Sequence, residues 1–105
     1  PGIRLGDIDD EFITPIYRKY GLEDARTFGT GHSFGIMHYW YGRDEIGEIR
    51  PYNDAILEPG MVLSIEPMIS IEGVGGFKHA DMFIVHEEGV EQLTNFDNGV
   101  IVIEP

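Results

Sequence analysis

Residues 57–69 of the chain read LEPGMVLSIEPMI, and this stretch predicts a turn followed by a buried strand. Pro59 and Gly60 suit the second and third positions of a type II turn, because proline fixes φ and glycine tolerates a positive φ. The apolar run that follows them has the length of a strand. Pro67 cannot donate a hydrogen bond to a neighbouring strand, so we expect this strand to end or bulge there.

Glu66 places one carboxylate at the end of this apolar run. Burial of a charged carboxylate is costly unless another group compensates its charge or satisfies its oxygens. We therefore expect Glu66 to have a partner within the folded protein. The residues of the stretch leave open whether this partner is a cation, a metal ion, a proton or a hydrogen-bond donor.

The N-terminal region predicts one helix over residues 8–20, with Asp7 as its N-cap. Pro15 lies inside this range and must kink the helix or restart it, whereas Gly21 is suited to end it. Apolar side chains recur at helical spacing and predict one apolar face. They are Phe12, Ile16 and Tyr20.

The second half of the chain predicts strands rather than helices. Residues 77–86 are rich in strand formers, residues 87–89 suit a hairpin turn, and residues 90–94 suit a short return strand. A last strand is expected at residues 100–103. The fold class is therefore α+β, with one N-terminal helix followed by a mostly antiparallel sheet.

Length and charge exclude several classes of protein. The chain has 105 residues, with Lys+Arg 7 against Asp+Glu 19 and a net charge of −12. This charge argues against nucleic acid and anionic membranes as partners. No apolar run reaches the roughly 20 residues that span a bilayer. The chain has no Cys, which excludes disulfides and thiolate metal sites and fits our expectation of a cytoplasmic protein.

His32 is the histidine that most favours a functional role. It lies in the sequence FGTGHSFG at residues 28–35, where glycines let the backbone approach another group closely and leave little packing around the imidazole. A purely structural hydrogen bond is the alternative. Residues 36–43, IMHYWYGR, either line a pocket and stack on a cation or fill the edge of the core.

Several motifs resemble the pita-bread family, which includes creatinase, aminopeptidase P, prolidase and methionine aminopeptidase. The motifs are GHSFG at 31–35, YGR at 41–43, LEPGMV at 57–62, SIEPMI at 64–69, GGFK at 75–78, Asp81, and EQLT at 91–94. They occur in the family's order and cover nearly the whole chain. Three of these motifs are most similar to those of creatinase, namely HSFG, YGR and EPMI.

The resemblance implies that the chain is part of a larger catalytic domain. In the family this domain has two pseudo-symmetric halves around one site, and residues 1–105 resemble only the second half. We therefore expect a single partial domain, which begins at Pro1 without an initiator Met. The resemblance further implies a homodimer for the intact parent protein, and no activity for this chain alone.

Two residues acquire catalytic roles from the resemblance. His32 matches the family histidine that ligates metal in the peptidases and lines the substrate site in creatinase. Glu66 matches the first of two metal-ligand glutamates, which in creatinase faces the guanidinium-bearing substrate instead. The second glutamate should fall at Ala80, whose side chain cannot bind a metal.

Four further residues are expected to bind substrate. His79 lies one place before the position at which creatinase has a histidine, and a bulge would be needed to turn it toward the site. A second family histidine should fall at Tyr39, but the imidazole here is at His38. Arg43 belongs to the YGR motif.

Three functions are compatible with these residues. The first is a creatinase-like hydrolase, without a cofactor, that cleaves a C–N bond in a small amino-acid-derived or guanidinium substrate. The second is an Xaa-Pro aminopeptidase or dipeptidase that holds a divalent metal (Mn, Co or Zn) through His32 and Glu66 and acts on short peptides. The third is a non-catalytic binding module of the same fold. Ala80 favours it, because a ligand residue of the family is lost at this position.

Overall fold

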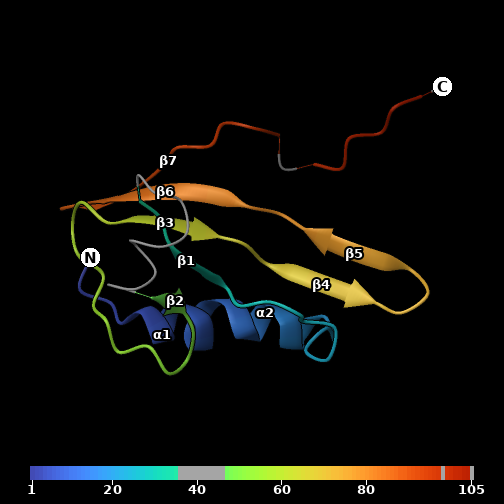
Figure 1. Cartoon of the computed structure of the whole chain (residues 1–105), viewed down its shortest axis with the longest axis horizontal. Helices are drawn as coiled ribbons and strands as arrows, with labels where there is room; N and C mark the ends of the chain where they lie inside the picture. Colours follow the sequence, from blue (N-terminus) through green and yellow to red (C-terminus); the bar gives the residue numbers. More distant parts are fainter. Residues whose placement is uncertain (36–46, 98, 105) are drawn as a thin grey trace.

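The computed structural model of the chain describes residues 1–35, 47–97 and 99–104. A helical segment at the N-terminus lies along one side of an antiparallel sheet (Figure 1). This arrangement confirms the expected α+β class. Within the described ranges, no helix is long and apolar enough to cross a membrane.

The helical segment consists of α1 (Leu5–Asp7), the π-helical η1 (Ile8–Ile13) and α2 (Thr14–Lys19). The N–H of Thr14 donates to the carbonyl of Asp9, five residues back. Such a widened turn suits the position before Pro15, because a proline ring cannot donate and would clash with the carbonyl of an ordinary helical turn. Pro15 thus stands in the first turn of α2, so of the two alternatives, a kink or a restart, the structure has the restart.

The helix begins earlier than expected, and the assignment of Asp7 as its N-cap is wrong. Arg4 precedes the first helical residue, and Asp7 lies inside α1. The carboxylate of Asp7 accepts a 2.9 Å hydrogen bond from Nε of Arg4. The backbone of Leu5 donates instead to the carbonyl of Ala55 at 2.8 Å, and this contact joins the helix start to the segment before β3.

In the described part of the chain, the main sheet has five antiparallel strands in the order β2-β1-β3-β6-β7. Their bounds are β1 (Gly31–Ser33), β2 (Glu48–Ile49), β3 (Val62–Ile65), β6 (Asp81–His86) and β7 (Gly89–Gln92). A second antiparallel pair consists of β4 (Met68–Ile71) and β5 (Gly75–Lys78). This pair continues the hairpin of β3 and β6 as a long arm (Figure 1).

Strand β3 is the centre of the main sheet, between β1 and β6. The turn before it has Gly60 at φ 89°, as the Pro-Gly sequence predicts. The strand ends at Ile65, directly before Glu66 and Pro67, so the predicted strand end is confirmed. The backbone of Gly31 passes so close to the carbonyl of Ser64 that a Cβ atom there would collide with it.

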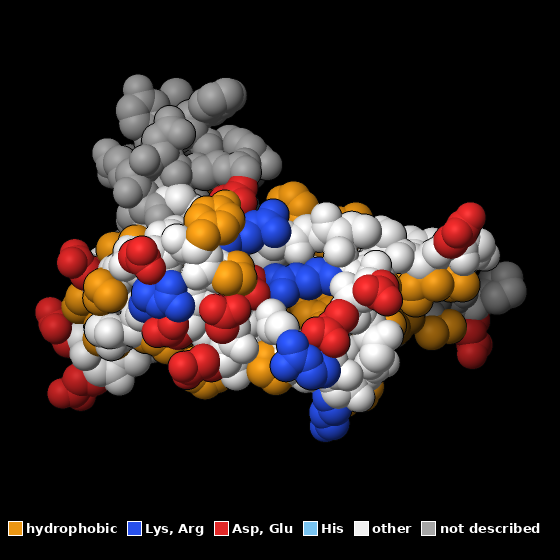
Figure 2. All heavy atoms as spheres, turned by 90° about the horizontal axis from the view of Figure 1, so that it is seen from below, with side chains coloured by type: hydrophobic (Ala, Val, Ile, Leu, Met, Phe, Trp, Pro, Cys, Tyr) orange, Lys and Arg blue, Asp and Glu red, His pale blue; other side chains and the backbone are white. Residues whose placement is uncertain are grey.

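The core lies where α1, β2, β3 and β6 meet. Its buried side chains are Leu5, Ile49, Leu57, Leu63 and Val85. The predicted apolar face of the helix, by contrast, is exposed to solvent in this chain: Phe12, Ile16 and Tyr20 are 55%, 54% and 65% exposed. Seen from the helix side, acidic and basic side chains are mixed with hydrophobic ones (Figure 2).

Two strand predictions need correction. The strand expected at 77–86 is divided into β5 and β6, because Glu66 and Pro67 interrupt the opposing strand and Pro67 has no N–H to donate. The segment 100–103 forms no strand in the described part of the chain, and it runs apart from the sheet (Figure 1). The return strand expected at 90–94 is confirmed as β7.

Candidate functional site

His32 lies in the middle of β1, opposite Ser64 of the central strand β3. Its side chain is buried, and Nδ1 lies 2.8 Å from the carbonyl oxygen of Ser33. The imidazole also stacks on Phe34 with 6.2 Å between ring centroids. The strand therefore fixes the ring and directs Nε2 toward the end of β3.

Glu66 follows β3 directly, and its side chain is 12% exposed. Oε1 accepts a 2.7 Å hydrogen bond from Oγ of Ser64 and lies 3.2 Å from Nε2 of His32. The structure thus brings together the two residues that the sequence singles out as catalytic. It also adds Ser64, which shares a face with Glu66 because alternate residues of a strand point the same way.

Lys78 provides the cationic partner that the sequence leaves open. Its Nζ lies 2.6 Å from Oε2 of Glu66 and 5.2 Å from the ring centroid of Phe28. The sequence could identify this lysine only once the register is known, because β4 and β5 pair Met68 with Lys78. We call Glu66, His32, Ser64 and Lys78 the Glu66 cluster.

The electrostatics of the cluster favour a charged carboxylate. Burial alone would raise the pKa of Glu66, but hydrogen bonds from Lys78 and Ser64 and the charges of His32 and Lys78 outweigh it, so this pKa lies below its ordinary value. Glu66 is therefore an anion at neutral pH, with protein donors on both of its oxygens.

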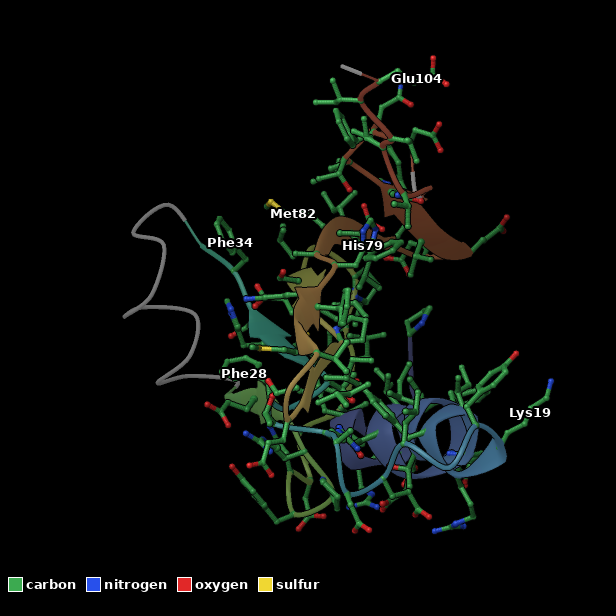
Figure 3. The ribbon with its side chains drawn as sticks, turned by 90° about the vertical axis from the view of Figure 1, so that its right-hand side faces the viewer. Lys19, Phe28, Phe34, His79, Met82 and Glu104 are labelled. Carbon is green, nitrogen blue, oxygen red and sulfur yellow. The ribbon has the colours of Figure 1, made fainter. Side chains whose placement is uncertain are left out.

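His79 is held on the other side of the sheet. Its Nε2 lies 2.8 Å from Oδ2 of Asp81, and Asp81 pairs with Ile65 rather than with a residue on the face of Ser64. Figure 3 shows His79 and Met82 on opposite sides of the strand, and Met82 pairs with Ser64. The structure thus joins His79 to Asp81 and does not bring it into the Glu66 cluster.

The remaining predicted site residues give no further ligands. His38, Tyr39 and Arg43 lie outside the described residues, so their roles stay predictions. Ala80 lies between β5 and β6 and has no donor atom in its side chain. Within the described ranges, no three His, Cys, Asp or Glu side chains gather into a group that could hold a metal ion.

A second buried network lies beside the cluster, and no pattern in the sequence indicates it. The carboxylate of Asp9, in η1, is fully buried and pairs with Nη2 of Arg26 at 2.5 Å. Hydroxyls of Thr14 and Thr30 donate to the same carboxylate at 2.9 and 2.7 Å. We call these four residues the Asp9 network.

The charge of Asp9 is stabilised by these donors. Burial would raise the pKa of Asp9, but hydrogen bonds from Arg26, Thr30 and Thr14 outweigh it and lower this pKa below its ordinary value. The ring of Tyr17 lies 5.0 Å from the guanidinium carbon of Arg26 and covers it. The network therefore fastens the helical segment to the loop that leads into β1.

Comparison with known proteins finds one family model and several relatives that this chain resembles. The family model described as metallopeptidase family M24 matches residues 1–87. Creatinase from Bacillus sp. (strain B-0618) is 45% identical over 103 residues, which cover 94% of this chain and 25% of that protein. The chain thus spans about a quarter of the length of this curated relative.

Solved structures agree in fold. Prolidase from Pyrococcus furiosus matches with a TM-score of 0.79 and 30% identity, over 93% of this chain and 27% of that one. Dipeptidase PepE from Mycobacterium ulcerans matches with a TM-score of 0.84 and 27% identity, over 96% of this chain and 26% of that one. The architecture seen here is therefore part of a pita-bread fold.

Proposed function

The chain belongs to metallopeptidase family M24, and from this membership we propose that it supplies part of the active site of a creatinase-like hydrolase. The reaction would cleave a C–N bond in a small amino-acid-derived or guanidinium substrate. The observation that carries the proposal is the Glu66 cluster, a buried carboxylate that is kept ionised by Lys78, Ser64 and His32.

Each residue of the cluster has a distinct role in this proposal. Glu66 binds the cationic nitrogen group of the substrate through charge-assisted hydrogen bonds. Nδ1 of His32 stays on the carbonyl oxygen of Ser33, and Nε2 turns from Oε1 of Glu66 to the substrate, where it donates a hydrogen bond or polarises the carbonyl group. Ser64 holds Oε1 of Glu66 in place. His38, Tyr39 and Arg43 are further substrate-binding residues in this proposal.

The family name implies a metal, but the described residues do not fit one. His32 and Glu66 are suitable ligand types, yet within the described ranges no third His, Cys, Asp or Glu side chain joins them in a group that could hold a metal ion. The family position for a second glutamate is occupied by Ala80. We therefore derive no step of the reaction through a metal ion.

A metal-dependent Xaa-Pro peptidase is the second candidate function. The similarity to prolidase from Pyrococcus furiosus favours it. In that case the missing ligands must come from residues beyond those described, with His32 and Glu66 completing the set. A third candidate is a binding module without catalysis. In that case the Glu66 cluster would bind a ligand, and the protein would show no turnover.

The chain covers about a quarter of the relatives it matches, so the proposal concerns an intact parent protein. We propose that this parent is a cytoplasmic homodimer, acts on small molecules or short peptides, and owes its proton-transferring base to residues outside residues 1–105. The 105-residue chain alone should then be inactive, because it holds only some of the groups that the reaction requires.

The experiment measures two properties of the intact parent protein, purified without chelators. Elemental mass spectrometry gives its metal content, and a screen of guanidinium and N-methylated amino-acid substrates gives its activity. We expect no stoichiometric metal, and turnover that falls about a hundredfold in kcat/KM in Glu66→Gln, because the substrate cation loses its charged partner. The matched control is Glu58→Gln, which changes an exposed glutamate.

The outcomes separate the three functions. Stoichiometric metal together with cleavage of Xaa-Pro peptides would establish the peptidase reading instead. An absence of metal together with no turnover on any substrate would leave the binding module. Equal losses of activity in Glu66→Gln and Glu58→Gln would show that Glu66 does not act in the site.

A further inference from the structure

Lys78 occupies a position with the two features that bind an organic cation. Its ammonium group lies 2.6 Å from the carboxylate of Glu66 and over the ring of Phe28, with 5.2 Å to the ring centroid. A carboxylate supplies charge and hydrogen-bond acceptors, and an aromatic face attracts cations through its quadrupole. The same pair of groups would bind the ammonium or guanidinium group of a ligand.

We propose that Lys78 is an internal occupant of the substrate's cation site and that an ammonium or guanidinium ligand displaces it. This inference rests on the proposed function, in which Glu66 binds the cationic nitrogen group. It adds that Lys78 competes with the substrate and so determines how tightly the cation is held.

Lys78 is more exposed than Glu66, so it is the member of this ion pair that a ligand can displace. The side chain of Lys78 is 44% exposed, whereas that of Glu66 is 12% exposed. Lysine has a long flexible stem and a strongly hydrated ammonium group, and half-exposed ion pairs are held only weakly. All four residues of β5 are exposed, so solvent is available to receive the displaced ammonium group.

Glu66 stays in place when Lys78 leaves. Ser64 donates a 2.7 Å hydrogen bond to Oε1, whereas Lys78 binds Oε2. Displacement therefore frees one oxygen for the ligand and leaves the other anchored. A planar guanidinium group suits this arrangement, because it can donate to Oε2 with its edge while its face lies against Phe28.

The test measures binding of methylguanidinium to the intact parent protein by isothermal titration calorimetry. Methylurea is the neutral ligand of similar shape. We expect Lys78→Met, which keeps an apolar stem but removes the charge, to bind methylguanidinium about fivefold more tightly, with no gain for methylurea. Lys78→Arg should restore the weaker binding, because it restores a cation at the same place.

Two further variants control for other effects. Lys19→Met removes another lysine that lies over an aromatic ring, 5.3 Å from the centroid of Tyr20, and should leave binding unchanged. Glu66→Gln should abolish methylguanidinium binding in any background. If Lys78→Met does not fold, Lys78→Gln removes the same charge and keeps a hydrogen-bonding side chain.

The outcomes distinguish this inference from the proposed function. Tighter binding of methylguanidinium alone supports displacement. Unchanged or weaker binding in Lys78→Met overturns it, shows that Lys78 assists the ligand or is irrelevant, and leaves the proposed role of Glu66 intact. Failure of the unsubstituted protein and of every Lys78 variant to bind methylguanidinium overturns the proposed role of Glu66, and the inference with it.

Discussion

The backbone N–H of Glu66 donates a 2.7 Å hydrogen bond to the carbonyl oxygen of Thr30. The hydroxyl of Thr30 in turn donates to the buried carboxylate of Asp9. One residue therefore belongs to the Asp9 network through its side chain and supports the Glu66 cluster through its backbone. Changes in the helical segment should reach the candidate site along this connection.

The first prediction concerns the buried ion pair of this network. Arg26→Met should lower the free energy of unfolding by about 3 kcal/mol, because it leaves the fully buried Asp9 without its cation. Urea denaturation followed by circular dichroism measures the change. Methylguanidinium binding should weaken as well, since Thr30 loses a neighbour that fixes it.

Arg18→Met is the matched control for this variant. Arg18 pairs with Glu23 on the surface, where its side chain is 68% exposed. Exposed pairs contribute about 1 kcal/mol or less, so the control should cost far less than Arg26→Met. Equal costs for the two variants would show that the Asp9 network does not stabilise the fold.

The second prediction is a pH dependence. The pKa of Asp9 is lower in the folded protein than its ordinary value, so its ionised form stabilises the fold at neutral pH. This contribution is complete above the ordinary carboxyl pKa and is lost as pH falls through the lower folded value. Asp9→Asn should therefore be less stable near about pH 7, with a difference that narrows toward about pH 2.

Asp10→Asn tests whether this effect is specific. Asp10 is the next residue along the chain, with a half-exposed side chain 3.9 Å from Arg4. The stability gap between Asp9→Asn and Asp10→Asn, measured by urea denaturation at a series of pH values, should close in acid. A gap that stays constant would rule out protonation of Asp9 as the cause.

The third prediction concerns the close approach of β1 and β3. Gly31→Ala should cost about 2 kcal/mol or more, because the new Cβ collides with the carbonyl of Ser64 and must push the two strands apart. Gly76→Ala is the control in β5, where a Cβ meets Oγ of Ser70 at an ordinary 3.5 Å. Thermal denaturation should show a large shift for the first variant only, and similar shifts would contradict the close approach.

The sequence predicts the central elements of this fold because they depend on local chemistry. Pro59 has a fixed φ and Gly60 accepts the positive φ of the turn, and Pro67 cannot donate to the ladder of a central strand. The failed prediction at 100–103 shows the limit of such reasoning. Apolar and β-branched residues favour a strand, but a strand also needs a neighbour to pair with, and the sequence does not show where the chain lies.

The partners in both polar networks depend on long-range geometry. Lys78 reaches Glu66 only because β4 and β5 pair in one register, and Arg26 reaches Asp9 because the loop before β1 returns to the helix. The periodicity of residues within a segment predicts neither the register of β4 and β5 nor the path of this loop. The sequence therefore identifies Glu66 as a residue in need of a partner without identifying the partner.

The last prediction concerns Tyr17, which fastens α2 to the arm. Its hydroxyl accepts a hydrogen bond from the N–H of Met68 at 3.1 Å and donates to the carbonyl of the same residue at 3.4 Å. Met68 follows Glu66 and Pro67, so this contact supports the chain just beyond the cluster. Tyr17→Phe should cost about 1 kcal/mol, because the ring stays while both hydrogen bonds are lost.

Tyr20→Phe provides the comparison, since Tyr20 is 65% exposed and stands at the end of the same helix. Urea denaturation measures the free energy of unfolding of both variants. The value for Tyr20→Phe should stay close to that of the unsubstituted protein. Hydrogen exchange at the N–H of Met68 gives a local readout, which should speed up in Tyr17→Phe alone. Unchanged exchange in that variant would mean that the hydroxyl does not hold β4 to the helix, and that packing of the ring suffices.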